Sequence, residues 1–156
     1  MIQIRYYSRT GTTHQVATDI ADRIPDSSIE RIYPVKERSY PNWLARSFLP
    51  GSTVDIEPTE TDLTDANVLF LGMPKWTFSC PPAMRFLKQA TLDDVPVGLF
   101  ITYGGFDEKR YATSHVSRLQ NRGADVRGVF LVQRDKIDTT EYNEGLEQFC
   151  RSVIPE

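Results

Sequence analysis

Short apolar runs recur along the chain, separated by stretches in which apolar residues stand three or four positions apart. The runs are typical of strands buried on both faces of a sheet, and the spaced pattern is typical of helices that cover a sheet. The five runs expected to form strands are Ile2–Tyr7, Ser28–Tyr33, Asn67–Gly72, Val95–Tyr103 and Ala124–Gln133.

Helix signals fill the gaps between these runs. After the first run, Val16, Ala17 and Ile20 mark one apolar helix face, and Pro25 ends that helix. Gly123 closes a later helix, as glycine often does. The predicted helices span 11–24, 82–90, 108–122 and 139–153, the last beginning at Thr139 or Thr140.

Five strands that alternate with helices predict an α/β fold: a doubly wound, five-stranded parallel sheet with helices on both faces. We expect the 156 residues to form a single domain, 1–156. In such sheets ligands sit outside the carboxyl ends of the strands. The turns after Tyr7, Gly72 and Tyr103 are therefore the places to look for a site.

One connection, Pro34–Asp65, is longer than most loops and is rich in Pro, Ser, Thr and charged residues. We interpret it mostly as a connecting segment. Within it, Trp43 and Phe48 form either a short helix that packs at the sheet edge or a lid that docks a partner, and packing is the favoured interpretation.

The charge balance excludes some classes of partner. With 18 Lys and Arg against 21 Asp and Glu, the net charge of −3 provides no large basic field for nucleic acid. The longest apolar runs are far shorter than the roughly 18 residues of a membrane span. We therefore expect no nucleic acid partner and no membrane span.

The N-terminus and the cysteines bear on compartment and metal binding. Met1–Arg5 enters a strand pattern at once and lacks the order of a secretory signal, which predicts a cytoplasmic protein. Cys80 and Cys150 form no C-x-x-C pair and do not lie near two histidines, which argues against a zinc site or a disulfide scaffold. Both are interpreted as packing thiols.

The first turn has the chemistry of a phosphate cradle. It leaves a strand, opens a helix and carries four hydroxyls, on Ser8, Thr10, Thr12 and Thr13. A helix N-terminus offers unpaired N–H groups and a partial positive charge to such an anion. The alternative is a Ser/Thr-rich helix cap, but capping needs fewer hydroxyls. The turn lacks Gly-Lys-Ser/Thr and G-x-G-x-x-G, so ATP and NAD fit less well than a simple phosphate ester.

At two turns the sequence resembles the flavodoxin family. Around the first, the signature spacing of that family is met by Ile4, Tyr6, Ser8, Gly11, Thr13, Ala17 and Ile20. Arg5 departs from it, since an apolar residue is usual there, and either snorkels from an edge or pairs with a carboxylate. The run 72–87 is similar to the family's flavin loop, with a glycine, a proline, an aromatic residue and a proline-started helix ending in Phe-Leu.

The resemblance implies a flavodoxin-like sheet with strand order 2-1-3-4-5 and one bound FMN. The FMN-binding residues it implies are Ser8, Arg9, Thr10, Gly11, Thr12, Thr13, Pro74, Lys75, Trp76, Thr77, Phe78, Tyr103, Gly104, Gly105 and Phe106. Arg9 either contacts the phosphate or is an exposed loop cation. Trp76 is the preferred ring-stacking residue, against the alternative that it packs in the core. Tyr103 or Phe106 covers the other face.

The function that the resemblance implies is electron transfer through FMN between redox partner proteins, whose identity stays open. The alternative is an FMN-dependent NAD(P)H:quinone or small-molecule oxidoreductase. A third possibility is a flavin-free signalling or interaction module of the same topology. A phosphoacceptor module is disfavoured because no predicted strand ends in Asp. No residue is assigned a catalytic role.

Overall fold

The computed structural model describes residues 1–49 and 51–154 and contains a five-stranded parallel sheet. The strand order is β2-β1-β3-β4-β5, which confirms the predicted topology. The strands are β1 (Ile2–Tyr6), β2 (Ser27–Arg31), β3 (Val68–Pro74), β4 (Pro96–Tyr103) and β5 (Asp125–Gln133). Because all pairs are parallel, the carboxyl ends of the five strands lie at one edge of the sheet.

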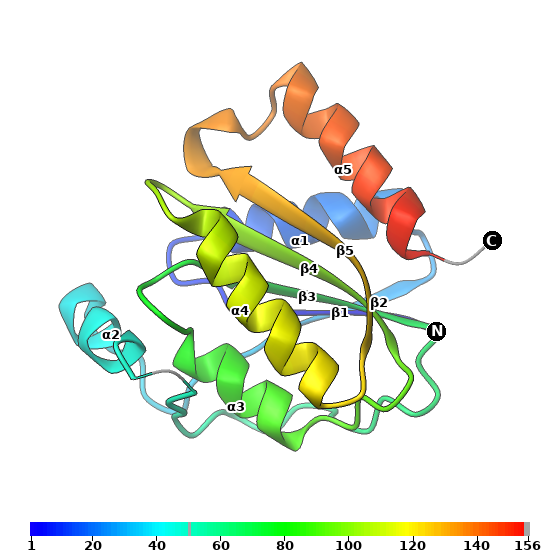
Figure 1. Cartoon of the computed structure of the whole chain (residues 1–156). Coiled ribbons are helices and arrows are strands. Elements are labelled where there is room, and N and C mark those ends of the chain that lie inside the picture. The colour runs from blue at the N-terminus through cyan, green and yellow to red at the C-terminus, as the bar shows by residue number, and fades with distance from the viewer. Residues whose placement is uncertain (50, 155–156) are drawn as a thin grey trace.

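Helices cover both faces of this sheet (Figure 1). They are α1 (Thr12–Arg23), α2 (Tyr40–Ser47), α3 (Pro81–Gln89), α4 (Glu108–Asn121) and α5 (Thr140–Val153), with a short 3₁₀ turn, η1 (Arg134–Lys136), after β5. The predicted elements are each present, with ends displaced by one or two residues. No helix in the described ranges 1–49 and 51–154 is long and apolar enough to cross a membrane.

Two hydrophobic cores lie on opposite faces of the sheet. On one face α1 and α5 pack on the sheet through residues such as Ile20, Leu146 and Phe149. On the other face α3 and α4 pack through residues such as Phe86 and Leu119. The alternation of side chains along each strand assigns neighbouring residues to the two cores.

Arg5, the departure from the family signature, is buried within β1. Its guanidinium lies 3.7 Å from the carboxylate of Glu30 on the neighbouring strand β2. It also donates to the carbonyl of Ile4 at 3.1 Å. Burial lowers the pKa of Arg5, and the nearby carboxylate of Glu30 opposes that effect. Of the two alternatives for Arg5, pairing with a carboxylate is the one observed.

The long connection 34–65 contains α2, and its packing interpretation holds for Trp43. The Trp43 side chain is fully buried and donates from Nε1 to Glu37 at 2.6 Å. Phe48, one residue beyond α2, is exposed instead. Val54 and Leu63 from the same connection are buried against the α3–α4 face. The segment is therefore part of the core, and it covers more of the sheet than a simple connection does.

Candidate functional site

The β1–α1 turn presents a helix N-terminus without a cap. Gly11 precedes α1 with φ of 102°, and no side chain caps the helix. Such a left-handed conformation favours glycine. The first turn of α1 carries no acidic residue. Its unpaired N–H groups and the partial positive charge of the helix end are therefore available to an anion.

Neighbouring strands hold this turn in place. The Gly11 amide donates to Oγ of Ser8 at 3.1 Å, and the Arg31 guanidinium at the end of β2 donates to the Ser8 carbonyl oxygen. The hydroxyls of Thr13 and Thr102, on α1 and β4, lie 2.8 Å apart. Ser8, Thr13 and Thr102 are buried. The hydroxyls of Ser8 and Thr13 are thus held by the protein itself.

A small cavity of about 40 Å³ lies where the turn meets the other strand ends. It brings together these residues expected from the sequence: Ser8, Arg9, Thr10, Thr12, Thr13, Pro74, Lys75 and Trp76. Three further lining residues were missed: Tyr40, Thr102 and Arg134. The cavity has the size of a single small anion rather than of a whole nucleotide.

Cations from three different segments line this cavity. Arg9 comes from the first turn, Lys75 from the turn after β3 and Arg134 from the 3₁₀ turn after β5. The Arg9 guanidinium lies over the Tyr40 ring, 5.3 Å from its centre. The cations and hydroxyls together form a site suited to a phosphate group.

Trp76, the residue expected to stack on the ring, is buried in this structure. Its side chain is 5% exposed. One face stacks on Trp43 at 5.3 Å between ring centres, and Tyr7 meets it edge-on at 5.5 Å. The Trp76 ring thus packs in the core, as the alternative interpretation expected, and Trp76 also lines the cavity.

Thr77 and Phe78 lie farther along the same turn, against α2. Their amides donate to the hydroxyl and the carbonyl oxygen of Ser47, at 3.0 and 2.9 Å. The Phe78 side chain is 36% exposed, with the Arg110 guanidinium 5.0 Å from the ring centre. Phe78 is thus available at the surface but is not a lining residue of the small cavity.

The turn after β4 places Phe106 at the surface. Phe106 is 79% exposed and has the Lys75 ammonium 5.1 Å from its ring centre. Tyr103 is half-buried instead, in a separate hollow beside β5 and α5. Neither Gly104 nor Gly105 has a positive φ. A Cβ at Gly105 would meet nothing within 4 Å, so the glycine there leaves open space beside the site.

Cys80 is not a candidate nucleophile. The thiol is fully buried at the start of α3, and burial raises its pKa. It therefore stays protonated, as expected of a packing residue. A larger hollow, of about 700 Å³, lies elsewhere, between α1 and β2, and is lined by none of the residues expected from the sequence at the site.

Comparisons with known proteins place this arrangement in context. No protein-family model matches the chain. An uncharacterized protein from Archaeoglobus fulgidus is 32% identical over 141 residues, which cover 87% of this chain and 88% of that protein. The chain belongs to one family with this archaeal protein.

Solved structures identify the fold. A Bacteroides eggerthii protein has a TM-score of 0.78 at 18% identity, covering 99% of this chain and 98% of that one. A Lactobacillus acidophilus flavoprotein in complex with FMN has a TM-score of 0.70 at 18% identity, covering 88% of this chain and 95% of that one. The two-electron reduced Megasphaera elsdenii flavodoxin has a TM-score of 0.62 at 21% identity, covering 97% of this chain and 99% of that one. This chain has the flavodoxin-like fold.

Of the three lining residues that were missed, two had a signal in the sequence and one had none. Thr102 and Arg134 end or follow β4 and β5, and the same carboxyl-end rule that selected the other turns points to them. Tyr40 carries no such signal, because only the packing of α2 against the strand ends brings it to the cavity. In this flavodoxin-like structure, the site is therefore built from more segments than the three turns singled out in the sequence.

Proposed function

We propose that the protein binds FMN and transfers electrons through it between redox partner proteins. The observation that carries the proposal is the phosphate-sized cavity at the N-terminus of α1, lined by hydroxyls and by Arg9, Lys75 and Arg134. The flavodoxin-like fold supports it, and a similar flavoprotein from Lactobacillus acidophilus is a complex with FMN. The cytoplasm is the proposed compartment, supported by the two free cysteines.

The residues present fit the phosphate of FMN. In the proposed complex, the first-turn amides of α1 and the hydroxyls of Ser8, Thr10, Thr12 and Thr13 hold the phosphate oxygens, while the three cations balance the phosphate charge. No acidic side chain lines this cavity. A site of this composition favours a dianion over a neutral alcohol, so phosphorylated flavin is selected over riboflavin.

The surroundings of the cavity fit the flavin ring. The open space beside Gly105 lets a flat ligand approach the backbone, and Phe106 offers an exposed aromatic surface. Lys75 lies between this surface and the phosphate cavity. Tyr111 fixes the turn that carries Lys75, because its hydroxyl donates to the Pro74 carbonyl at 3.1 Å.

Bound FMN supplies one- and two-electron transfer, and the chain supplies position and charge. The exposure of Phe78 and Phe106 favours a carrier, because a ring beside them is accessible to another protein. The nearby cations stabilise added negative charge on the flavin, which makes the proposed carrier a milder reductant than one with an acidic site.

A titration of the purified apo-protein with FMN, riboflavin and FAD, followed by flavin fluorescence, tests the proposal. Tight binding of FMN with much weaker binding of riboflavin is expected. Substituting Thr12→Val in the cradle should weaken FMN binding and leave riboflavin binding unchanged. Thr113→Val, at an exposed position of α4, serves as the matched control. Absence of flavin binding would contradict the proposed function without affecting the assignment of the fold.

The same sample separates the carrier from the oxidoreductase. NAD(P)H added alone to the FMN-loaded protein should leave the flavin spectrum unchanged over many minutes. Rapid bleaching of the flavin by NAD(P)H would instead favour an FMN-dependent NAD(P)H:quinone or small-molecule oxidoreductase.

A further inference from the structure

Exposed apolar side chains gather at one end of the molecule. Among the described residues, ten large hydrophobic side chains are exposed, and seven of them lie on segments at the carboxyl ends of the strands. Of these seven, Phe106 is 79% exposed, Leu49 is 67% exposed, and Phe48 and Val35 are each 59% exposed. Such a concentration of apolar surface in a protein of this size marks a contact region.

Positive charge gathers at the same end. We define the carboxyl-end surface as residues 7–11, 31–49, 74–80, 103–110 and 133–139. These segments hold ten of the 18 Lys and Arg residues and only five of the 21 Asp and Glu residues. Their net charge is therefore +5, and the rest of the chain carries −8 to give the total of −3. A bound phosphate of roughly −2 still leaves this surface positive.

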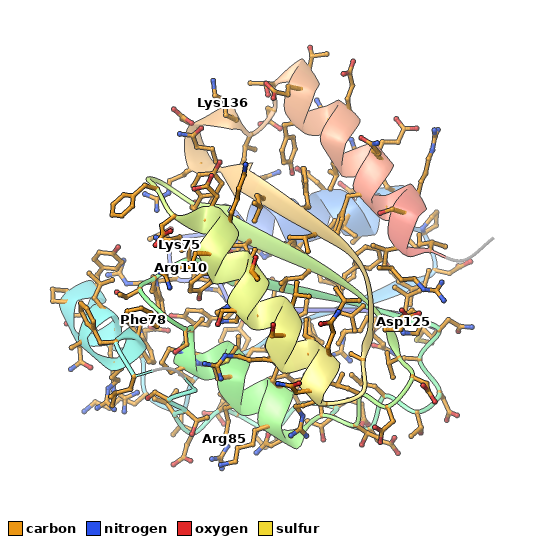
Figure 2. The ribbon with its side chains drawn as sticks, in the orientation of Figure 1. Lys75, Phe78, Arg85, Arg110, Asp125 and Lys136 are labelled. Atoms are coloured by element: carbon orange, nitrogen blue, oxygen red, sulfur yellow. The ribbon has the colours of Figure 1, made fainter. Side chains whose placement is uncertain are left out.

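The cations and the aromatic rings of this surface contact one another. Arg110 lies over Phe78, Lys75 lies over Phe106, and the rings of Phe48 and Phe78 meet edge-on at 6.0 Å between centres. Figure 2 shows Lys75, Arg110 and Phe78 grouped at this end of the molecule, whereas Asp125 at the start of β5 lies at the opposite end. Apolar contact and charge are thus offered by the same segments.

We propose that the carboxyl-end surface docks an acidic redox protein, whose carboxylates pair with these cations around an apolar centre. The proposal rests on the proposed FMN site, because the same surface borders the cavity lined by Arg9, Lys75 and Arg134. Docking there brings a partner's redox centre next to the flavin. Opposite charges also speed the encounter, by about 10- to 1,000-fold at low ionic strength.

The carboxylates within this surface favour a protein over other polyanions. Asp107, Glu108 and Asp135 stand among the cations. A uniformly anionic lipid or nucleic acid surface is repelled by them, whereas a folded protein places its own charges point by point. One acidic partner protein is therefore the occupant to which the proposal commits.

Two forms of one haem protein provide the test. Native cytochrome c is basic, and succinylation of its lysines makes it acidic with the haem and fold retained. NMR shifts of the ¹⁵N-labelled, FMN-loaded chain are measured with each form at low and high salt. The succinylated form should shift amides of the carboxyl-end surface at low salt, with at least about tenfold tighter binding than the native form. Equal binding, or shifts confined to other regions, overturns the proposal.

Matched charge reversals locate the interaction. Arg46→Glu on α2 should weaken binding of succinylated cytochrome c by about threefold or more, and Phe48→Ser should weaken it with little change in salt dependence. Lys88→Glu, an exposed residue at the far end of α3, makes the same change in net charge and should leave the affinity within error. A loss with Lys88→Glu equal to that with Arg46→Glu contradicts specific docking.

Three further measurements test docking without FMN, self-association of the chain and binding to lipid. The NMR measurement repeated without FMN reports docking even when flavin binding fails, so failure of this inference is distinguishable from failure of the proposed function. Concentration-dependent broadening without cytochrome identifies a second copy of the chain as the occupant and overturns the proposal. Binding to vesicles of anionic phospholipid, stronger than to succinylated cytochrome c, also overturns it.

Discussion

At the scale of single residues, Arg134 is the strongest test of the site. It reaches the cavity from the far end of the sequence, on the turn after β5. Substitution of Arg134→Gln removes a charge that faces the proposed phosphate. Because a hydrogen bond to a charged group contributes about 1.5 kcal/mol, FMN affinity should fall about tenfold, with riboflavin affinity unchanged. Fluorescence titration measures both.

Lys136 provides the control for that substitution. It lies on the same 3₁₀ turn and is exposed, but it does not line the small cavity. Lys136→Gln makes the same change in net charge, and FMN affinity should stay within about twofold. An equal loss in both variants would mean that overall charge, and not a contact with Arg134, sets the affinity.

His115 makes stability depend on pH. It is fully buried on α4, where Nδ1 donates to the Tyr111 carbonyl at 2.8 Å and the two rings lie 4.2 Å apart. Burial lowers the pKa of His115 from 6.5 to about 4. Between these two pH values the unfolded chain gains a proton that the folded chain does not. Folding stability should therefore fall by about 3 kcal/mol as the pH drops through this window.

Urea unfolding of the protein and of His115→Leu, at pH 7 and at pH 4, isolates this contribution. Carboxylates lower the stability of both proteins in acid, so the difference between the two pH dependences is the quantity of interest. The variant should lose about 3 kcal/mol less than the parent protein. Parallel pH profiles would show that His115 does not titrate as described.

At the scale of elements, Trp43 should anchor α2. It is fully buried, stacks on Trp76 and bonds to Glu37. Trp43→Ala should therefore lower the free energy of unfolding by about 4 kcal/mol, measured by denaturant titration. Phe48→Ala, at a position 59% exposed, should change it by no more than about 0.5 kcal/mol. Similar effects of both would contradict the packing of α2.

In the ion pair between β1 and β2, the buried Arg5 should depend on its partner, whereas the 40% exposed Glu30 should not. Glu30→Gln leaves the Arg5 guanidinium buried with less compensation, so unfolding should become easier by about 1 kcal/mol, a value reduced because Glu30 is 40% exposed. Arg5→Met replaces the charge by an apolar chain of similar length and should be neutral or stabilising. The midpoints of urea unfolding compare the two variants directly.

Most elements were predictable because local signals mark their ends. Pro25 follows the end of α1, Pro81 begins α3, and Gly123 takes a φ of 88° just beyond α4. The exception is the connection 34–65. Val54 and Leu63 are isolated apolar residues without a period, so their burial depends on contacts with a sheet that the local sequence does not describe.

At the scale of the whole molecule, the fold was more predictable than the site. The parallel sheet follows from the succession of strands and helices and the handedness of crossovers, whereas its strand order was implied by the resemblance to the flavodoxin family. The small cavity instead joins Thr10, Tyr40, Lys75 and Arg134, which only the folded sheet brings together. Trp76 shows the same limit, since its position after a strand indicated exposure, whereas Trp43 from a distant helix covers it.

The core under α1 and α5 joins segments that lie far apart in the sequence, and this affects folding during synthesis. Ile4, Val16 and Ile20 emerge from the ribosome well before Leu146 and Phe149, which cover the same face of the sheet. Until α5 is released, the nascent chain exposes an apolar sheet face. Truncation before α5 should therefore give a chaperone-bound or aggregated product rather than a smaller folded protein.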